Sequence, residues 1–237
     1  MPFVSRRLGV AFYFVPKVAC TSLKTWFWEF ENEEQAEPQE RLTRRFLGKK
    51  KPAEDVARRS VHHRPETRTR SFKSSVPPPE GYQSLAVVRD PVDRLISAWK
   101  NKVNYDTFKR RDEIGDLENE LLSTRPSFGE FLENYDAYRF NSRAVRVHTF
   151  PLEWHLGPDR SHFTQVFKLE ELGTLAEHLS GLADKDVNFS NKNASGWVGR
   201  EISLTADQKD ILRVITKVDY QWLGNMYNQD ESMARLL

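Results

Sequence analysis

A lysine and two hydroxyl side chains stand where a buried strand is expected to end and a helix to begin. The apolar run at residues 10–15 is strongly β-prone, and Pro16 stops it. Lys17 follows at once, and Thr21 and Ser22 open a helical pattern. The free N–H groups and the dipole at a helix start attract anions, and the lysine adds a full positive charge. The segment therefore predicts a site for a phosphate or sulfate ester, although a plain strand–helix corner with an exposed lysine has the same pattern.

A second segment repeats this design further along the chain. Residues 85–88 form a short apolar run, and Arg89 stands at its carboxyl end. Asp90 followed by Pro91 is typical of a helix cap with proline in the first turn. The planar guanidinium of Arg89 suits a phosphate, and Ser97 on the following helix can donate a further hydrogen bond. Ligands of open α/β sheets bind beyond the carboxyl ends of the strands, so both segments are expected to bring their polar groups to one edge.

These segments need a sheet to position them, and the rest of the chain predicts one. Residues 162–169 are expected to form another parallel strand, followed by a helix at 170–182 and a later helix at 204–218. Residues 146–150 are predicted to form a short strand or a turn. Strands that alternate with helices favour a parallel sheet covered on both faces. The expected fold is α/β, with a P-loop-like parallel sheet of about four or five strands, in one domain over 1–237 that carries an insertion at 29–80.

In this order, the two segments resemble the cofactor motifs of sulfotransferases that use 3′-phosphoadenosine 5′-phosphosulfate (PAPS). VPKVACTSLK resembles the loop that grips the 5′-phosphosulfate, and VVRDPVDRLISAWKNK resembles the segment that grips the 3′-phosphate. Within that family the chain is most similar to the carbohydrate sulfotransferases. Weaker similarity continues in VFKLEEL, NKNAS and DYQWLG.

The resemblance implies an enzyme that moves a sulfuryl group from PAPS to an acceptor hydroxyl by in-line displacement, without a metal. Charge grows on the bridging oxygen as the donor leaves, and Lys17 is expected to stabilise it. Lys24, one helical turn on, is expected to face either the cofactor or solvent. The residues expected to bind the cofactor are Lys17, Val18, Ala19, Cys20, Thr21, Ser22, Arg89, Ser97, Lys192 and Ser195.

The acceptor hydroxyl needs a base, and histidine is the side chain best matched to neutral pH. His62 and His63 lie in a basic stretch between the two cofactor segments, and His63 is one candidate for the base. His148, in VRVHTFP, is the other. A glutamate just after the first helix, Glu33 or Glu34, is the alternative.

Charge is distributed unevenly along the chain. Residues 29–40 hold six acidic side chains and no basic one, whereas residues 41–73 hold twelve Lys or Arg against three acids. Such a basic block is typical of a solvated segment, of a guide for an anionic acceptor such as a glycan, or of a nucleic-acid arm. The cofactor motifs on either side favour a glycan over nucleic acid as partner.

Composition places the chain among charged globular proteins. It has 237 residues, of which 38% are hydrophobic and 30% charged, and it has no apolar run long enough to span a bilayer. Cys20 is the single cysteine, so no intrachain disulfide can form, and no Cys/His spacing suggests zinc. These features predict a cytoplasmic, bacterial-type enzyme, with a lumenal form lacking its anchor as the alternative.

Two other functions compete with sulfuryl transfer. An ATP-dependent small-molecule kinase would need a Walker A loop and a magnesium ligand, yet no glycine lies between Gly9 and Gly48. A non-catalytic polyanion-binding module would use the basic block and would tolerate loss of Lys17.

Overall fold

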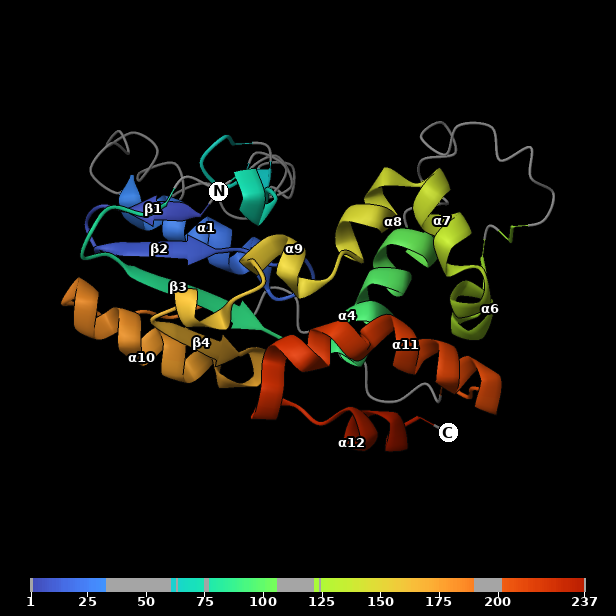
Figure 1. Cartoon of the computed structure of the whole chain (residues 1–237). Helices are drawn as coiled ribbons and strands as arrows, with labels where there is room; N and C mark the ends of the chain where they lie inside the picture. The colour runs from blue at the N-terminus through green and yellow to red at the C-terminus, as the bar shows by residue number, and fades with distance from the viewer. Residues whose placement is uncertain are drawn as a thin grey trace, which may run out of the picture. The chain divides into compact units, whose positions relative to one another are not determined.

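The computed structural model describes residues 2–32, 61–62, 64–74, 77–105, 122–123, 125–189 and 202–236. The described residues form two compact units (Figure 1). The sheet unit takes its residues from Met1–Val15, Ala19–Val88 and Ser161–Ala194. The helical unit takes its residues from Pro16–Val18, Arg89–Arg160 and Ser195–Leu237.

A four-stranded sheet forms the centre of the sheet unit, with the strand order β1-β2-β3-β4. The strands are β1 (Phe3–Ser5), β2 (Val10–Tyr13), β3 (Gln83–Val88) and β4 (Gln165–Lys168). β2, β3 and β4 are parallel, which confirms the three strands predicted from the sequence. β1 was not predicted, and it runs antiparallel to β2 because a tight turn at 6–9 reverses the chain. The fold is therefore α/β, a sheet flanked by helices, with one antiparallel edge strand.

One face of this sheet is covered by two helices, α1 (Cys20–Glu31) and α10 (Leu172–Ala183). Register places Phe12 and Leu85 opposite each other and Val87 opposite Phe167, so all four side chains share this face. Phe27 of α1 is fully buried, and its ring centroid lies 4.6 Å from that of Phe12. Phe167 meets the His178 ring of α10 at 5.8 Å. Figure 1 shows α1 beside β1 and β2, and α10 beside β4.

The other face of the sheet presents Tyr13. Its ring packs edge-on against Phe163, with centroids 5.1 Å apart, and lies 6.0 Å from Phe72 in the short 3-10 helix η2 (Phe72–Ser74). The Tyr13 hydroxyl is 2.8 Å from Nε2 of His162. Burial raises the pKa of Tyr13, so this hydroxyl keeps its proton at neutral pH.

Most of the helical unit follows β3 along the chain. Its elements are α4 (Pro91–Ala98), a π-helical continuation η3 (Trp99–Tyr105), α6 (Phe128–Glu133), α7 (Tyr135–Asn141), α8 (Arg143–His148), α9 (Leu152–Leu156), α11 (Ala206–Leu223), η6 (Gly224–Met226) and α12 (Gln229–Ala234). Short 3-10 turns η4 (Arg160–His162) and η5 (Leu169–Glu171) flank β4. The fully buried side chains of Phe131 and Leu212 belong to the apolar core that joins α4, α6 and α11.

Local capping signals set the ends of the longer predicted helices. The Thr205 hydroxyl accepts from the Gln208 backbone N–H at 3.2 Å, and the Gln208 side chain accepts from the Thr205 N–H, which completes a capping box. α11 ends at Gly224, whose φ of 60° is a conformation that favours glycine. The helix predicted at 204–218 is thus confirmed and extends by five residues.

The prediction of a strand or turn at 146–150 is wrong for its first three residues, which belong to α8. Val147 in this stretch, and Val145 just before it, favour extended backbone. The Ser142 hydroxyl caps the helix by accepting from the Val145 N–H at 3.3 Å, and Val145 is buried in the core of the helical unit. Packing and a cap therefore outweigh the weak local propensity.

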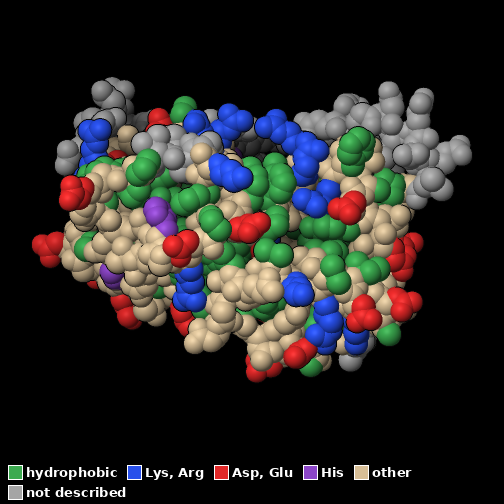
Figure 2. Space-filling view, in the orientation of Figure 1, with side chains coloured by type: hydrophobic (Ala, Val, Ile, Leu, Met, Phe, Trp, Pro, Cys, Tyr) green, Lys and Arg blue, Asp and Glu red, His purple; other side chains and the backbone are tan. Residues whose placement is uncertain are grey.

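Charged side chains are interspersed with hydrophobic ones on the face drawn in Figure 2, as the 30% charged composition leads one to expect. Among the described residues, every helix is too short or too polar to cross a lipid bilayer.

Candidate functional site

The loop that leaves β2 has a strained backbone. Lys17 and Ala19 both have positive φ angles, 68° and 44°, whereas the intervening Val18 does not. This region costs a non-glycine residue roughly 1–3 kcal/mol, and such strain gathers at ligand sites. Ala19 is the N-cap of α1 and provides no side-chain cap. Residues that alternate between positive and negative φ just before a helix without a side-chain cap leave backbone N–H groups available to an anion. The local geometry therefore supports the predicted phosphate or sulfate ester site.

The hydroxyls predicted to bind the cofactor lie in the first turn of α1. Thr21 and Ser22 are both half-buried. Oγ1 of Thr21 lies 2.9 Å from Nε2 of His62, so the structure brings a histidine to this hydroxyl. The sequence singled out His63 instead, which lies outside the described residues. The pairing could not be read from the sequence, because 41 positions separate the two partners and His62 differs from His63 by no local signal.

Lys24 is buried inside the sheet unit with a relative exposure of 2%. Its ammonium donates to Thr69 Oγ1 at 2.8 Å and lies 5.3 Å from the centre of the Phe14 ring. Of the two alternatives predicted for Lys24, cofactor or solvent, burial excludes solvent. Burial lowers the pKa of Lys24 from its ordinary value of 10.5, because the charged form loses hydration that one hydroxyl and one ring replace only in part.

The lowered pKa of Lys24 predicts a pH-dependent difference in stability between the wild type and a Lys24→Met variant. Below pH 10.5 the unfolded chain holds this proton more tightly than the folded chain does, so wild-type stability rises with pH up to that value. The variant lacks this rise. Urea unfolding of both proteins between pH 7 and 10.5 measures the difference, with the exposed Lys73→Met as a matched control. If the stability difference between wild type and Lys24→Met stayed constant over this pH range, the lowered pKa of Lys24 would be contradicted.

Arg89 stands at the carboxyl end of β3, as predicted, and its side chain is half-buried. Within the helical unit its Nη1 lies 3.5 Å from the backbone oxygen of Lys17, a long hydrogen bond. The structure thus brings Lys17 and Arg89, one residue from each of the two predicted cofactor segments, into contact. Ser97 lies half-buried on α4, within the same unit.

The aspartate of the Arg-Asp-Pro segment anchors α4. Asp90 caps the helix by accepting from the Asp93 N–H at 3.1 Å, and its other oxygen accepts from the Tyr220 hydroxyl at 3.0 Å. Ser232 of α12 donates to the same carboxylate, and Arg235 lies 3.4 Å from it. Burial raises the pKa of Tyr220, which keeps this donor protonated. The carboxylate therefore fixes the start of the helix that carries Ser97.

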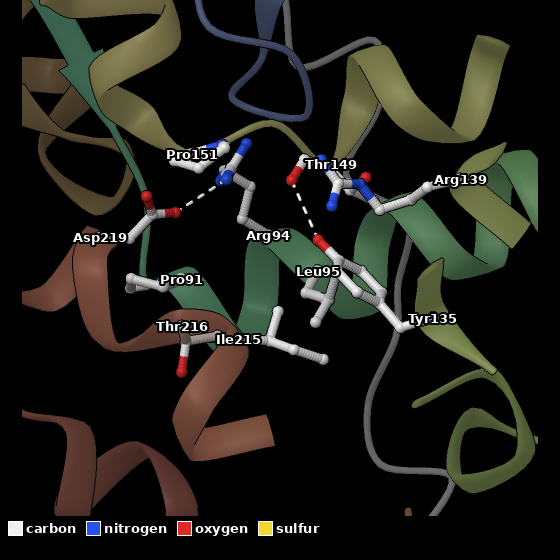
Figure 3. A pocket seen from close by; sticks show the side chains of 10 residues that line it. All are labelled: Pro91, Arg94, Leu95, Tyr135, Arg139, Thr149, Pro151, Ile215, Thr216 and Asp219. Atoms are coloured by element: carbon white, nitrogen blue, oxygen red, sulfur yellow. Dashed lines mark hydrogen bonds and ion pairs between the residues drawn. The ribbon is translucent and has the colours of Figure 1, made fainter. Parts of the chain in front are cut away.

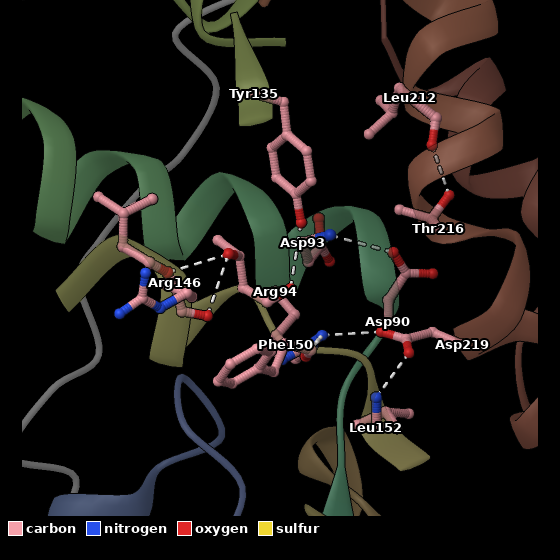
Figure 4. A network of polar contacts seen from close by, with 12 residues as sticks. Asp90, Asp93, Arg94, Tyr135, Arg146, Phe150, Leu152, Leu212, Thr216 and Asp219 are labelled. Atoms are coloured by element: carbon pink, nitrogen blue, oxygen red, sulfur yellow. Dashed lines mark hydrogen bonds and ion pairs between the residues drawn. The ribbon is translucent and has the colours of Figure 1, made fainter. Parts of the chain in front are cut away.

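A buried ion pair joins α4 to α11 (Figure 4). Nη2 of Arg94 donates to Oδ2 of Asp219 at 2.8 Å and to the Phe150 carbonyl at the same distance. The second carboxylate oxygen accepts from the Leu152 N–H at 2.7 Å. Both charged side chains are about 95% buried. The DYQWLG similarity pointed to Asp219, but only the fold shows its partner.

The histidine candidates differ in their surroundings. Nδ1 of His148 lies 2.7 Å from the Ala144 carbonyl, so Nδ1 carries the proton in the neutral ring and Nε2 holds the lone pair that a base needs. His148 is half-buried at the end of α8. His63, Glu33, Glu34, Lys192 and Ser195 lie outside the described residues.

Within the described part of the chain, no three His, Cys, Asp or Glu side chains gather closely enough to hold a metal ion. Cys20 is half-buried in the first turn of α1 and has a free thiol.

Comparison with known proteins agrees with the geometry of these segments. The model of the sulfotransferase family matches residues 2–233, nearly the whole chain. No curated protein and no solved structure matches significantly. The match spans the loop with Lys17, the Arg-Asp-Pro segment and the C-terminal helices. The chain therefore belongs to the sulfotransferase family, whose members take the sulfuryl group from PAPS.

Proposed function

We propose that this sulfotransferase transfers the sulfuryl group to a hydroxyl of a carbohydrate or another anionic acceptor. The long hydrogen bond between Arg89 and the Lys17 carbonyl carries the proposal, because it joins the two segments that resemble the cofactor motifs of carbohydrate sulfotransferases. The basic block at 41–73 supports an anionic acceptor through long-range attraction. Its structure lies largely outside the described residues.

In the proposed reaction each cofactor residue has a distinct task. The N–H groups of the loop, together with Thr21 and Ser22, hold the 5′-phosphate. Arg89 and Ser97 hold the 3′-phosphate, and Lys192 and Ser195 add a cation and a donor to it. His62 positions Thr21 through its contact with the hydroxyl.

Transfer itself needs a cation and a base. The acceptor oxygen bonds to sulfur as the bond from sulfur to the 5′-phosphate oxygen breaks, and the Lys17 ammonium stabilises the charge that grows on that oxygen. The acceptor proton passes to a base. His148 is the first candidate because its Nε2 holds a lone pair, and His63 is the second.

Donor recognition is tested by thermal stabilisation with the product nucleotide, 3′,5′-adenosine bisphosphate. A ligand present at about 100 times its Kd, bound only to the folded state, adds about 2.7 kcal/mol of stability. We expect a clear rise in Tm with the bisphosphate and little with AMP. An Arg89→Ala variant should lose this preference, whereas the exposed Arg143→Ala should keep it. A larger shift with ATP and magnesium would favour a kinase instead.

A further inference from the structure

A cavity of about 200 Å³, partly open to solvent, lies within the helical unit and is bordered by α4, α7, α11 and the segment at 149–151 (Figure 3). Its apolar lining comes from Pro91, Leu95, Pro151 and Ile215. None of the residues assigned above to the cofactor lines it. The cavity therefore shares the Arg-Asp-Pro segment with the proposed donor site, but none of the residues proposed to bind the donor.

Unpaired hydrogen-bond donors face this cavity. Arg94 lines it and is only 5% exposed, yet no described residue accepts from its Nε or its Nη1. Arg139 also lines it, and its buried Nε lacks an acceptor among the described residues. A buried N–H without a partner costs about 1–3 kcal/mol, more when charged, so these donors indicate an acceptor that binds there.

The net charge of the side chains that line the cavity favours an anionic ligand. Two guanidinium groups and one carboxylate line the cavity, and both oxygens of that carboxylate, Asp219, are occupied by Arg94 and the Leu152 N–H. Arg139 has a long contact of 3.4 Å with Asp136, whose side chain is 92% exposed, and its guanidinium lies 5.1 Å from the centre of the Tyr135 ring. An exposed ion pair contributes little, and a ring does not neutralise the guanidinium, so the charge of Arg139 is available to a ligand.

The remaining polar groups do not favour a sugar. Tyr135 donates its hydroxyl proton to the Thr149 carbonyl at 3.1 Å. Thr149 donates to the Val145 carbonyl at 2.9 Å, and Thr216 donates to the Leu212 carbonyl at 2.8 Å. Each of these three hydroxyls therefore already donates its proton to a backbone carbonyl of the protein. Among the described residues that line the cavity, the side-chain donors without an acceptor belong to Arg94 and Arg139.

From these contacts we infer that the cavity binds a small organic anion, a carboxylate or sulfate group on an apolar body the size of one six-membered ring. The size agrees, because an apolar cavity of about 150 Å³ accommodates benzene, which leaves room here for one charged group. The oxyanion accepts from Arg94 and Arg139, and the ring packs on Leu95 and Ile215. We expect the anion to bind independently of the donor, because none of the residues proposed to bind the donor lines the cavity.

The test uses sodium benzoate with the full-length protein. Benzoate should raise Tm saturably, whereas the neutral isostere benzamide and the polar ring of glucuronate should bind at least about tenfold more weakly, the expected effect of one lost charge-assisted contact or of an unpaired polar group. Equal stabilisation by benzamide or by glucuronate would overturn the proposal.

Variants locate the binding. Arg139→Gln removes one charge from a partly exposed position and should raise the Kd for benzoate about tenfold, while Arg143→Gln on α8 should leave it unchanged. Ile215→Trp should fill the cavity and abolish the response even if Arg139→Gln proves unstable. Arg89→Ala should lose the bisphosphate response and keep the benzoate response. Loss of both responses in that variant would place benzoate in the donor site and refute the inference.

Discussion

A Lys17→Ala variant is expected to lose about 10²–10³-fold in kcat, the usual effect of removing one donor that stabilises charge in the transition state. The fold should survive, because Lys17 contacts Arg89 through its backbone oxygen, which alanine retains. The bisphosphate should therefore still raise Tm. Turnover is measured with PAPS and a panel of hydroxyl acceptors.

The control for this experiment is Lys73→Ala, which removes an exposed lysine from η2. It should keep full turnover. Near-normal transfer by Lys17→Ala would remove the Lys17 side chain from the mechanism. Loss of turnover together with loss of the bisphosphate response would mean that the side chain acts in binding rather than in the chemical step.

An Asp219→Ala variant is expected to lower the free energy of unfolding by about 3–5 kcal/mol, because it leaves the buried Arg94 charge without its partner. The Leu152 N–H also loses its acceptor. Urea unfolding of the variant and the wild type measures the loss.

The matched control for the buried pair is Asp136→Ala, which breaks the exposed contact with Arg139 and should cost less than about 1 kcal/mol. A double variant, Arg94→Met with Asp219→Leu, should recover much of the lost stability, because apolar side chains of similar volume can replace a buried ion pair. If Asp219→Ala lost less than about 1 kcal/mol, the prediction would be wrong, and water or a rearrangement would be stabilising the charge of Arg94 in place of the carboxylate.

Local signals explain which elements the sequence could predict. Apolar runs predicted the three parallel strands, and the cap at Asp90 predicted the start of the helix that follows β3. These signals act over three or four residues, so they can be read without knowing the fold. The edge strand β1 and helix α8 were missed because their formation depends on pairing with β2 and on burial of Val145.

The same distinction between local and long-range signals applies to the candidate site. Lys17 and Arg89 follow strands, and their meeting follows from parallel pairing. The partner of Thr21 and the burial of Lys24 depend on residues more than 40 positions away. Contacts at that separation leave no periodic trace in one sequence, so His62 could not be told from His63.

The carboxylate of Asp90 connects the Arg-Asp-Pro segment to residues that lie far along the chain. Ser232, 142 positions downstream, and Arg235 both bind it. Removing α12, or fusing a rigid tag to it, would therefore disturb the position of the Arg-Asp-Pro segment. Helix α12 thus holds the Arg-Asp-Pro segment in position from more than 130 positions away along the chain.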